Sequence, residues 1–182
     1  MFFKNILTKD KIYCIFYSTR LYNVIRRFKK EVKMQKIIIA SHGKFSKGIE
    51  DSIKILIGER AEVDFIAAYR EEIPDNRVLT EVFRKILSEN KSKEIIMFTD
   101  ITGGSITNTA LSFIPDNPNL HIISGSSLSL ILEYILTSEE EEEENKNPDY
   151  KKIIKQSIEE AKTGMVYINE ILNGGNEDDQ IL

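Results

Sequence analysis

The sequence predicts an α/β fold, a doubly wound and mainly parallel sheet with strand order 2-1-3-4. From residue 36 onward, short runs of apolar β-branched residues alternate with segments whose apolar residues recur at helical spacing, as in strand–helix–strand units. The composition, 41% hydrophobic and 30% charged, is that of an ordinary globular protein. A length of 182 residues is nearer to one domain than to two.

The strands are predicted first, because β-branched apolar runs are the clearest local signal. They are expected at about residues 36–41, 62–68, 94–99 and 119–124. The segments between and after them carry apolar residues three or four positions apart, which predicts helices packed on the sheet. These expected core positions are Ile49/Ile53/Leu56/Ile57, Val78/Val82/Phe83/Ile86, Ile106/Ala110/Leu111/Ile114 and Leu128/Ile131/Ile135.

The C-terminal part of the chain changes character at an acidic run. Residues Glu139–Glu144, with the segment through Pro148, break the last apolar stripe and are expected to form a solvated loop or a frayed helix end. Asp149 is a candidate cap for a final helix with apolar residues Ile153, Ile154, Ile158 and Ala161. Gly164 interrupts that pattern, and residues 165–172 contain enough β-forming residues for a short closing strand.

Charge divides the chain at Met34. Residues 1–33 carry nine Lys/Arg and two Asp/Glu, a net charge of +7, whereas residues 34–182 carry a net charge of −11. We therefore predict an N-terminal extension (1–33), a domain (34–172) and a C-terminal tail (173–182). The extension is interpreted as a tail or an upstream start-site artefact, in preference to a membrane-surface anchor. The acidic remainder is a poor candidate for binding nucleic acid.

Several classes of protein are excluded by what the sequence lacks. It has no apolar run long enough to cross a bilayer. Its single cysteine, Cys14, has no internal disulfide partner, and the sequence has no Cys/His cluster with zinc-binding spacing. These features predict a cytoplasmic protein with no metal and no other cofactor.

Two polar segments follow the first and third predicted strands. They are Ser41-His42-Gly43 and Asp100-Ile-Thr-Gly-Gly-Ser105. In a doubly wound sheet of order 2-1-3-4 these two strand ends flank the crevice where ligands bind. Their side chains are therefore expected to meet.

The residue types in these segments suit transfer of a phosphoryl group. His42 is a candidate nucleophile, and Asp100 could hold the proton of one ring nitrogen while the other nitrogen attacks. Gly103, Gly104 and Ser105 open a helix, where amides and a hydroxyl could bind phosphate oxygens. Taken singly, a loop histidine is more often incidental than catalytic, and Gly-Gly-Ser before a helix is more often a turn and cap than a phosphate site. The hypothesis therefore rests on their combination.

The other histidine, His121, lies within the fourth predicted strand and is expected to be structural.

These residues resemble a known family. The segments that carry the resemblance are Lys36-Ile-Ile-Ile-Ala-Ser-His-Gly43, Ile95-Ile-Met-Phe-Thr-Asp-Ile-Thr-Gly-Gly-Ser-Ile-Thr-Asn108 and Ile122-Ile-Ser-Gly-Ser-Ser-Leu-Ser-Leu130. In order and spacing they are similar to the mannose-family IIA proteins of the bacterial sugar phosphotransferase system, over about residues 34–172. The chain departs from the family's usual pattern at Thr102 and at Ser127–Ser129.

The resemblance implies a phosphocarrier. His42 would accept a phosphoryl group on Nε2 from phospho-HPr and pass it to a IIB domain, with Asp100 on Nδ1 and with Gly103, Gly104 and Ser105 on the phosphate oxygens. Contact with the membrane would be indirect, through IIC and IID components. The family also implies a homodimer in which an antiparallel C-terminal strand, here residues 165–172, is exchanged between subunits.

Three alternatives remain open from the residues. The phosphocarrier subunit of dihydroxyacetone kinase shares the fold and the histidine, but its third-strand pattern lacks the double glycine. Histidine phosphatases typically have arginine directly before the histidine, where this chain has Ser41. A non-enzymatic receiver-like or flavodoxin-like module is the third alternative. A receiver would carry an acidic pair after the first strand, and this chain has none there.

Overall fold

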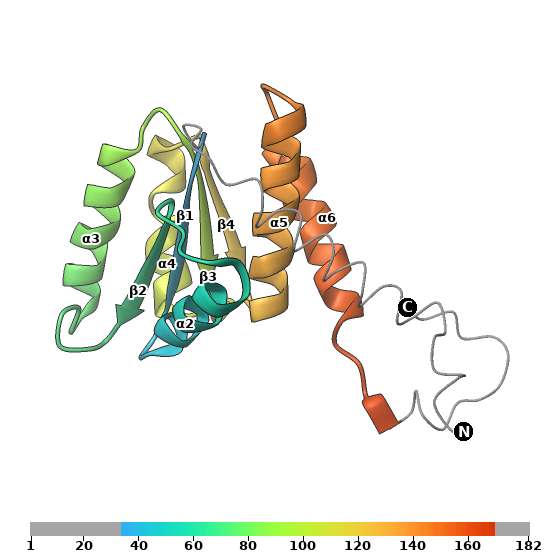
Figure 1. The fold of residues 1–182 in the computed structure, drawn as a ribbon. Coiled ribbons are helices and arrows are strands. Elements are labelled where there is room, and N and C mark those ends of the chain that lie inside the picture. Colours follow the sequence, from blue (N-terminus) through green and yellow to red (C-terminus); the bar gives the residue numbers. More distant parts are fainter. Residues whose placement is uncertain (1–33, 170–182) are drawn as a thin grey trace, which may run out of the picture.

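The structure, a computed structural model, describes residues 34–169 and contains a four-stranded parallel sheet with helices on both faces (Figure 1). The strands are Gln35–His42 (β1), Val63–Ala68 (β2), Glu94–Thr99 (β3) and Leu120–Ser124 (β4). Their bounds agree with the predicted ones to within one residue. The order β2-β1-β3-β4 confirms the predicted doubly wound topology.

Successive residues of the central strands point to opposite faces of the sheet. In β1, Ile37 and Ile39 belong to one buried cluster, whereas Ile38 and Ala40 belong to the other. Strand β3 divides its apolar residues in the same way. Because helices cover both faces, the central strands are apolar at almost every position, as parallel sheets usually are.

The helices form two layers. On one face lie α2 (Phe45–Ile57) and α5 (Leu128–Glu144), with α6 (Tyr150–Thr163) packed against α5 (Figure 1). On the other face lie α3 (Asn76–Glu89) and α4 (Ser105–Leu111), followed by the short 3₁₀ helix η1 (Ile114–Asp116). Asp149 caps α6 by accepting a hydrogen bond from the Lys152 amide, which confirms the predicted cap.

Three residues of the predicted apolar stripes are exposed instead of buried. Leu56, Leu111 and Ile114 keep 37%, 47% and 41% of their surface accessible. Helix α4 ends at Leu111, and η1 contains Pro115, so regular helical spacing stops before Ile114. The prediction of one continuous stripe through Ile114 was wrong for this reason.

The acidic run also differs from its prediction, because α5 continues to Glu144 and residues 145–149 form the loop. Glu139 is 5% exposed, and it accepts a hydrogen bond of 2.8 Å from Arg60. Tyr150 donates to Glu142 at 2.7 Å, and its pKa is raised by burial and then by this hydrogen bond. Arg60, which is distant in the sequence, and Tyr150, which follows the loop, thus stabilise a helical segment that looked solvated.

The closing strand predicted at 165–172 is not formed in residues 165–169, the part of it that the structure describes. Residues 165–167 have no regular structure, and residues 168–169 are helical. A strand is stable only when it pairs with another strand, and this segment extends away from the sheet (Figure 1). Residues 170–172, the predicted extension 1–33 and the predicted tail 173–182 lie outside the described residues.

Between residues 34 and 169, the structure contains no helix with the length and apolar character needed to span a bilayer.

Candidate functional site

The carboxyl ends of β1 and β3 bring His42 and Asp100 into contact. The two strands are parallel neighbours, with Ala40 opposite Thr99. The His42 backbone N–H donates to Asp100 Oδ2 at 2.8 Å, across 58 positions of sequence. Asp100 Oδ1 accepts from the Ile101 amide at 2.9 Å, which orients the carboxylate further.

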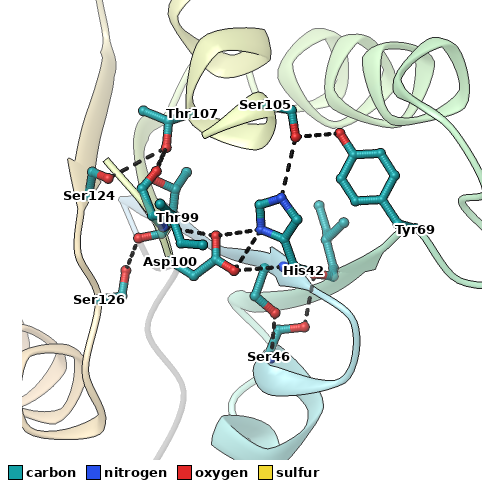
Figure 2. Close-up of polar contacts among 12 residues, drawn as sticks. His42, Ser46, Tyr69, Thr99, Asp100, Ser105, Thr107, Ser124 and Ser126 are labelled. Carbon is teal, nitrogen blue, oxygen red and sulfur yellow. Dashed lines mark hydrogen bonds and ion pairs between the residues drawn. The ribbon is translucent and has the colours of Figure 1, made fainter. Parts of the chain in front are cut away.

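The imidazole ring of His42 is held with one nitrogen toward the carboxylate (Figure 2). Its Nδ1 lies 2.9 Å from Asp100 Oδ2 and 3.2 Å from Oδ1. Because a carboxylate only accepts hydrogen bonds, this contact favours the tautomer with hydrogen on Nδ1 and the lone pair on Nε2. The His42 side chain is 38% exposed and that of Asp100 is 13% exposed. The ring is therefore oriented from inside and accessible from outside.

The second ring nitrogen faces α4 and the end of β2. Ser105 Oγ lies 3.3 Å from His42 Nε2, and the Tyr69 hydroxyl donates to the same Oγ at 2.6 Å (Figure 2). The Tyr69 ring also stacks on the imidazole, with 5.3 Å between centroids and 28° between planes. A carboxylate, an imidazole and two hydroxyls thus meet in one cluster.

The sequence analysis did not identify Tyr69. It directly follows β2, and the end of β2 lies at the same sheet edge as the ends of β1 and β3. An aromatic residue with a polar tip at that edge was the available signal. The prediction used only the ends of the first and third strands, and it therefore omitted the end of β2, which lies next to β1.

The two glycines before α4 serve different purposes. Gly103 has φ of 74°, a conformation that favours glycine. The Gly104 amide donates to the Ile101 carbonyl at 3.0 Å, so it is used within the turn. A Cβ on Gly104 would lie 3.1 Å from Ile101 O and 3.5 Å from His42 Cε1. Gly104 was expected to offer its amide to a phosphate oxygen. In the structure that amide is already used, and the residue instead leaves space beside the His42 ring.

Buried hydroxyls fasten the turn that carries Asp100. Thr107 Oγ1 donates to the Ile101 carbonyl at 2.7 Å and lies 2.8 Å from Thr99 Oγ1. The amide and the hydroxyl of Ser126 both donate to the Thr99 carbonyl, at 3.1 and 2.6 Å. The end of β3 is thereby tied to α4 and to the loop after β4, which limits motion of the carboxylate.

The loop after β1 is fastened to β2 in a similar way. Ser41 Oγ accepts from the Ser46 amide at 2.6 Å, and the Ser46 hydroxyl donates to the Ile66 carbonyl at 2.8 Å. Gly43, with φ of 57°, donates its amide to the Ala68 carbonyl at 2.9 Å. These contacts hold the backbone on both sides of His42.

His121 lies apart from this cluster. It is in β4, and its Nε2 is 3.0 Å from Glu94 Oε2 on the neighbouring strand, with 15% of the side chain exposed. This environment fits the expected structural role.

Comparison with known proteins identifies the family. Residues 36–154 match EIIA-man, described as the PTS system fructose IIA component, where PTS is the sugar phosphotransferase system. The chain belongs to this family. It is therefore a IIA component, a phosphocarrier of the sugar phosphotransferase system.

Similar proteins agree with this assignment. The PTS system fructose-specific EIIA component of Bacillus subtilis is 26% identical over 103 residues, which cover 56% of this chain and 69% of that protein. A structure described as a sugar phosphotransferase system permease from Klebsiella pneumoniae is 26% identical, with a TM-score of 0.66, over 80% of this chain and 99% of that one. The EIIA component from Streptococcus agalactiae shares the fold at 23% identity, with a TM-score of 0.61, over 75% of this chain and 98% of that one.

Proposed function

We propose that His42 is the phosphoacceptor of this IIA component, with Nε2 as the nucleophilic atom. The observation that carries the proposal is the contact of Nδ1 with Asp100, which directs the Nε2 lone pair away from the carboxylate and toward the Ser105 hydroxyl. A neutral imidazole can attack phosphorus only through an unprotonated nitrogen. The exposed fraction of His42, 38%, supports access by a partner protein.

The proposed step takes a phosphoryl group from the phosphohistidine of HPr. The Nε2 lone pair of His42 forms a new N–P bond, the N–P bond of the donor breaks, and its electron pair returns to the donor imidazole. The proton on Nδ1 stays between His42 and Asp100, where the carboxylate stabilises the positive charge that develops on the ring. A second transfer of the same kind would pass the group to a IIB domain.

The residues around Nε2 would bind the transferred group. Ser105 Oγ is within reach of an oxygen attached to a phosphorus on Nε2, and the first amides of α4 have no partner within the helix. Gly103 would supply its amide, whereas Gly104 would leave room beside the ring. These donors would form hydrogen bonds to the oxygens of a phosphoryl group on Nε2.

The wider role follows from the family. We propose a cytoplasmic domain of residues 34–172 that contacts the membrane only through the IIC and IID components. HPr and a IIB component are its proposed partners.

The test is direct phosphorylation. Incubation with enzyme I, HPr and labelled phosphoenolpyruvate is expected to place one phosphoryl group on each chain. The label should be lost in acid and kept in alkali, as for a phosphohistidine and unlike a phosphoserine. Labelling that requires enzyme I and HPr supports the proposal, whereas a chain that stays unlabelled under conditions that label a known IIA protein contradicts it.

We further propose a homodimer in which the C-terminal segment exchanges between subunits. Strands β2 and β4 are the two edges of the sheet in a single chain. Four consecutive apolar residues after α6, Met165 to Ile168, are 75%, 38%, 63% and 57% exposed. Pairing of this segment with a sheet edge in a second copy would cover the exposed apolar residues and that edge at once.

Two truncations test the dimer. Deletion of residues 164–182 is expected to give monomers or aggregates, because sheet edges lose their cover, whereas deletion of residues 1–33 should leave the dimer and the labelling of His42 unchanged. Light scattering of both truncated proteins measures the difference. A stable dimer without residues 164–182, or its loss on removal of residues 1–33, would place the interface elsewhere.

A further inference from the structure

Tyr69 makes two separate contacts with the proposed phosphoryl-transfer site. Its ring stacks on the His42 imidazole at 5.3 Å, and its hydroxyl donates to Ser105 Oγ at 2.6 Å (Figure 2). The Asn76 Oδ1 atom is 3.5 Å from the same hydroxyl, too far to compete with a bond of 2.6 Å. The Tyr69 ring also packs against the buried cluster on the face that carries α3 and α4.

The backbone of Tyr69 is held in a conformation that tyrosine rarely adopts. Its φ is 60°, and it is the only residue other than glycine with positive φ between residues 34 and 169. Two hydrogen bonds between Arg70 and Ile73, of 3.2 and 3.0 Å, close the tight turn that follows. Such a conformation persists when the surroundings enforce it, and it often occurs at functional sites.

We propose that Tyr69 is a positioning residue for phosphoryl transfer at His42. The proposal rests on the function proposed for His42. The stacked ring fixes the plane of the imidazole, and the phenol fixes the oxygen atom of Ser105. Through these two contacts Tyr69 sets the geometry of both the attacking nitrogen and a group that receives the phosphoryl oxygens.

The hydrogen atoms in this cluster explain the role of the phenol. Ser105 has a single O–H hydrogen, and Tyr69 donates its own hydrogen to the Ser105 oxygen. The Ser105 hydrogen is therefore free to point at the Nε2 lone pair, 3.3 Å away. Once Nε2 carries phosphorus it no longer accepts, and the same hydrogen can turn to a phosphoryl oxygen while Tyr69 keeps Ser105 Oγ in place. A hydroxyl that accepts one hydrogen bond is also a stronger donor in the next.

Two substitutions separate the ring from the hydroxyl. Tyr69→Phe keeps the stacked ring and removes the hydroxyl, whereas Tyr69→Asn removes both but tolerates positive φ. We expect the maximal transfer rate from phospho-HPr to fall about 3- to 10-fold in Tyr69→Phe, as for loss of one ordinary hydrogen bond. In Tyr69→Asn we expect a fall on the order of 10- to 100-fold, because the stacking is lost as well.

A double-variant cycle distinguishes positioning through Ser105 from a merely structural effect. In a Ser105→Ala background, Tyr69→Phe should cause little further loss, because the hydroxyl acts through Ser105. Tyr69→Asn should still slow transfer in that background, since stacking acts on His42 directly. An equal cost of Tyr69→Phe in both backgrounds, or a Tyr69→Phe rate equal to that of the unchanged protein, overturns the proposal.

A spectroscopic readout needs no phosphoryl donor. In ¹⁵N spectra of the imidazole nitrogens, Tyr69→Phe is expected to shift the His42 Nε2 signal, because the hydrogen bond from Ser105 weakens. His121 serves as the internal reference. Tyr150→Phe serves as the matched control, because it removes a phenol hydroxyl that donates to Glu142, away from His42. His42 signals that stay unchanged in Tyr69→Phe also overturn the proposal.

These arms separate two kinds of failure. If the unchanged protein is not labelled, or is labelled elsewhere than on His42, the proposed function itself fails. If His42 is labelled and Tyr69→Phe matches the unchanged protein in rate, only the role of Tyr69 fails.

Discussion

Replacement of His42 by alanine is expected to reduce labelling by phospho-HPr to background. Alanine offers no nucleophile. The Ser105 hydroxyl, 3.3 Å from Nε2, would at the same time lose the imidazole that could accept its proton. The fold should persist, because the hydrogen bond from residue 42 to Asp100 Oδ2 uses the backbone amide. Labelling per chain and circular dichroism of the same sample measure the two effects.

His121→Gln is the matched control for this experiment. His121 contacts Glu94 on a neighbouring strand and not the Asp100 carboxylate, so its replacement should leave labelling intact. Label that persists in His42→Ala at the level of the unchanged protein would refute the proposed phosphoacceptor. Label that disappears only in His121→Gln would move the site to β4.

Replacement of Asp100 by asparagine is expected to slow phosphoryl transfer by about 10²- to 10⁴-fold, where the upper limit is the loss found when the carboxylate that orients a catalytic histidine becomes an amide. The amide has a similar shape but no charge, so it cannot stabilise the positive charge that develops on His42. Rapid-quench measurements of transfer from phospho-HPr give the rate.

The hydrogen-bonding pattern indicates how asparagine would fit. Oδ2 accepts from both the His42 amide and Nδ1, whereas Oδ1 accepts from the Ile101 amide. The side-chain oxygen of asparagine should take the Oδ2 position, because only there does it satisfy two donors. Its NH₂ group would then face the Ile101 amide, and two donors would oppose each other at a partly exposed turn. We therefore expect a small loss of stability and an intact fold.

Asp64→Asn is the control for the loss of a carboxylate in general. Asp64 pairs with Lys36 at 2.7 Å between the first two strands and makes no contact with His42 among those described. Its transfer rate should stay close to that of the unchanged protein. A rate in Asp100→Asn that equals the rate in Asp64→Asn would remove Asp100 from the mechanism.

Local patterns were sufficient for the sheet. The runs around Ile37–Ala40 and Ile95–Phe98 are apolar at every position, which is typical of strands covered on both faces, and the structure confirms both. The same reasoning placed His42 and Asp100 at one edge, because the carboxyl ends of parallel strands lie together. Two short polar segments after buried strands were thus sufficient to predict that these side chains meet.

Local patterns failed where a residue depends on partners distant in the sequence. Glu139 belongs to an acidic run that looks solvated, yet Arg60, 79 positions earlier, pairs with it in the interior. Leu111 continues an apolar stripe, but α4 ends there and leaves it exposed. In both cases the local pattern predicted the wrong burial, because contacts with residues elsewhere in the fold decide whether a side chain is buried.

The sequence by itself determined the fold class, the strand order and the pairing of His42 with Asp100, because periodicity and topology depend on residue type and chain order alone. Only the tertiary structure decided which groups complete the site. The stacking of Tyr69 on His42 and its hydrogen bond to Ser105 join residues 27 and 36 positions apart. Tyr69 makes them from a backbone with φ of 60°, directly after the end of β2. No periodic pattern encodes that angle, because it is set by the turn that follows and by the atoms that the ring meets.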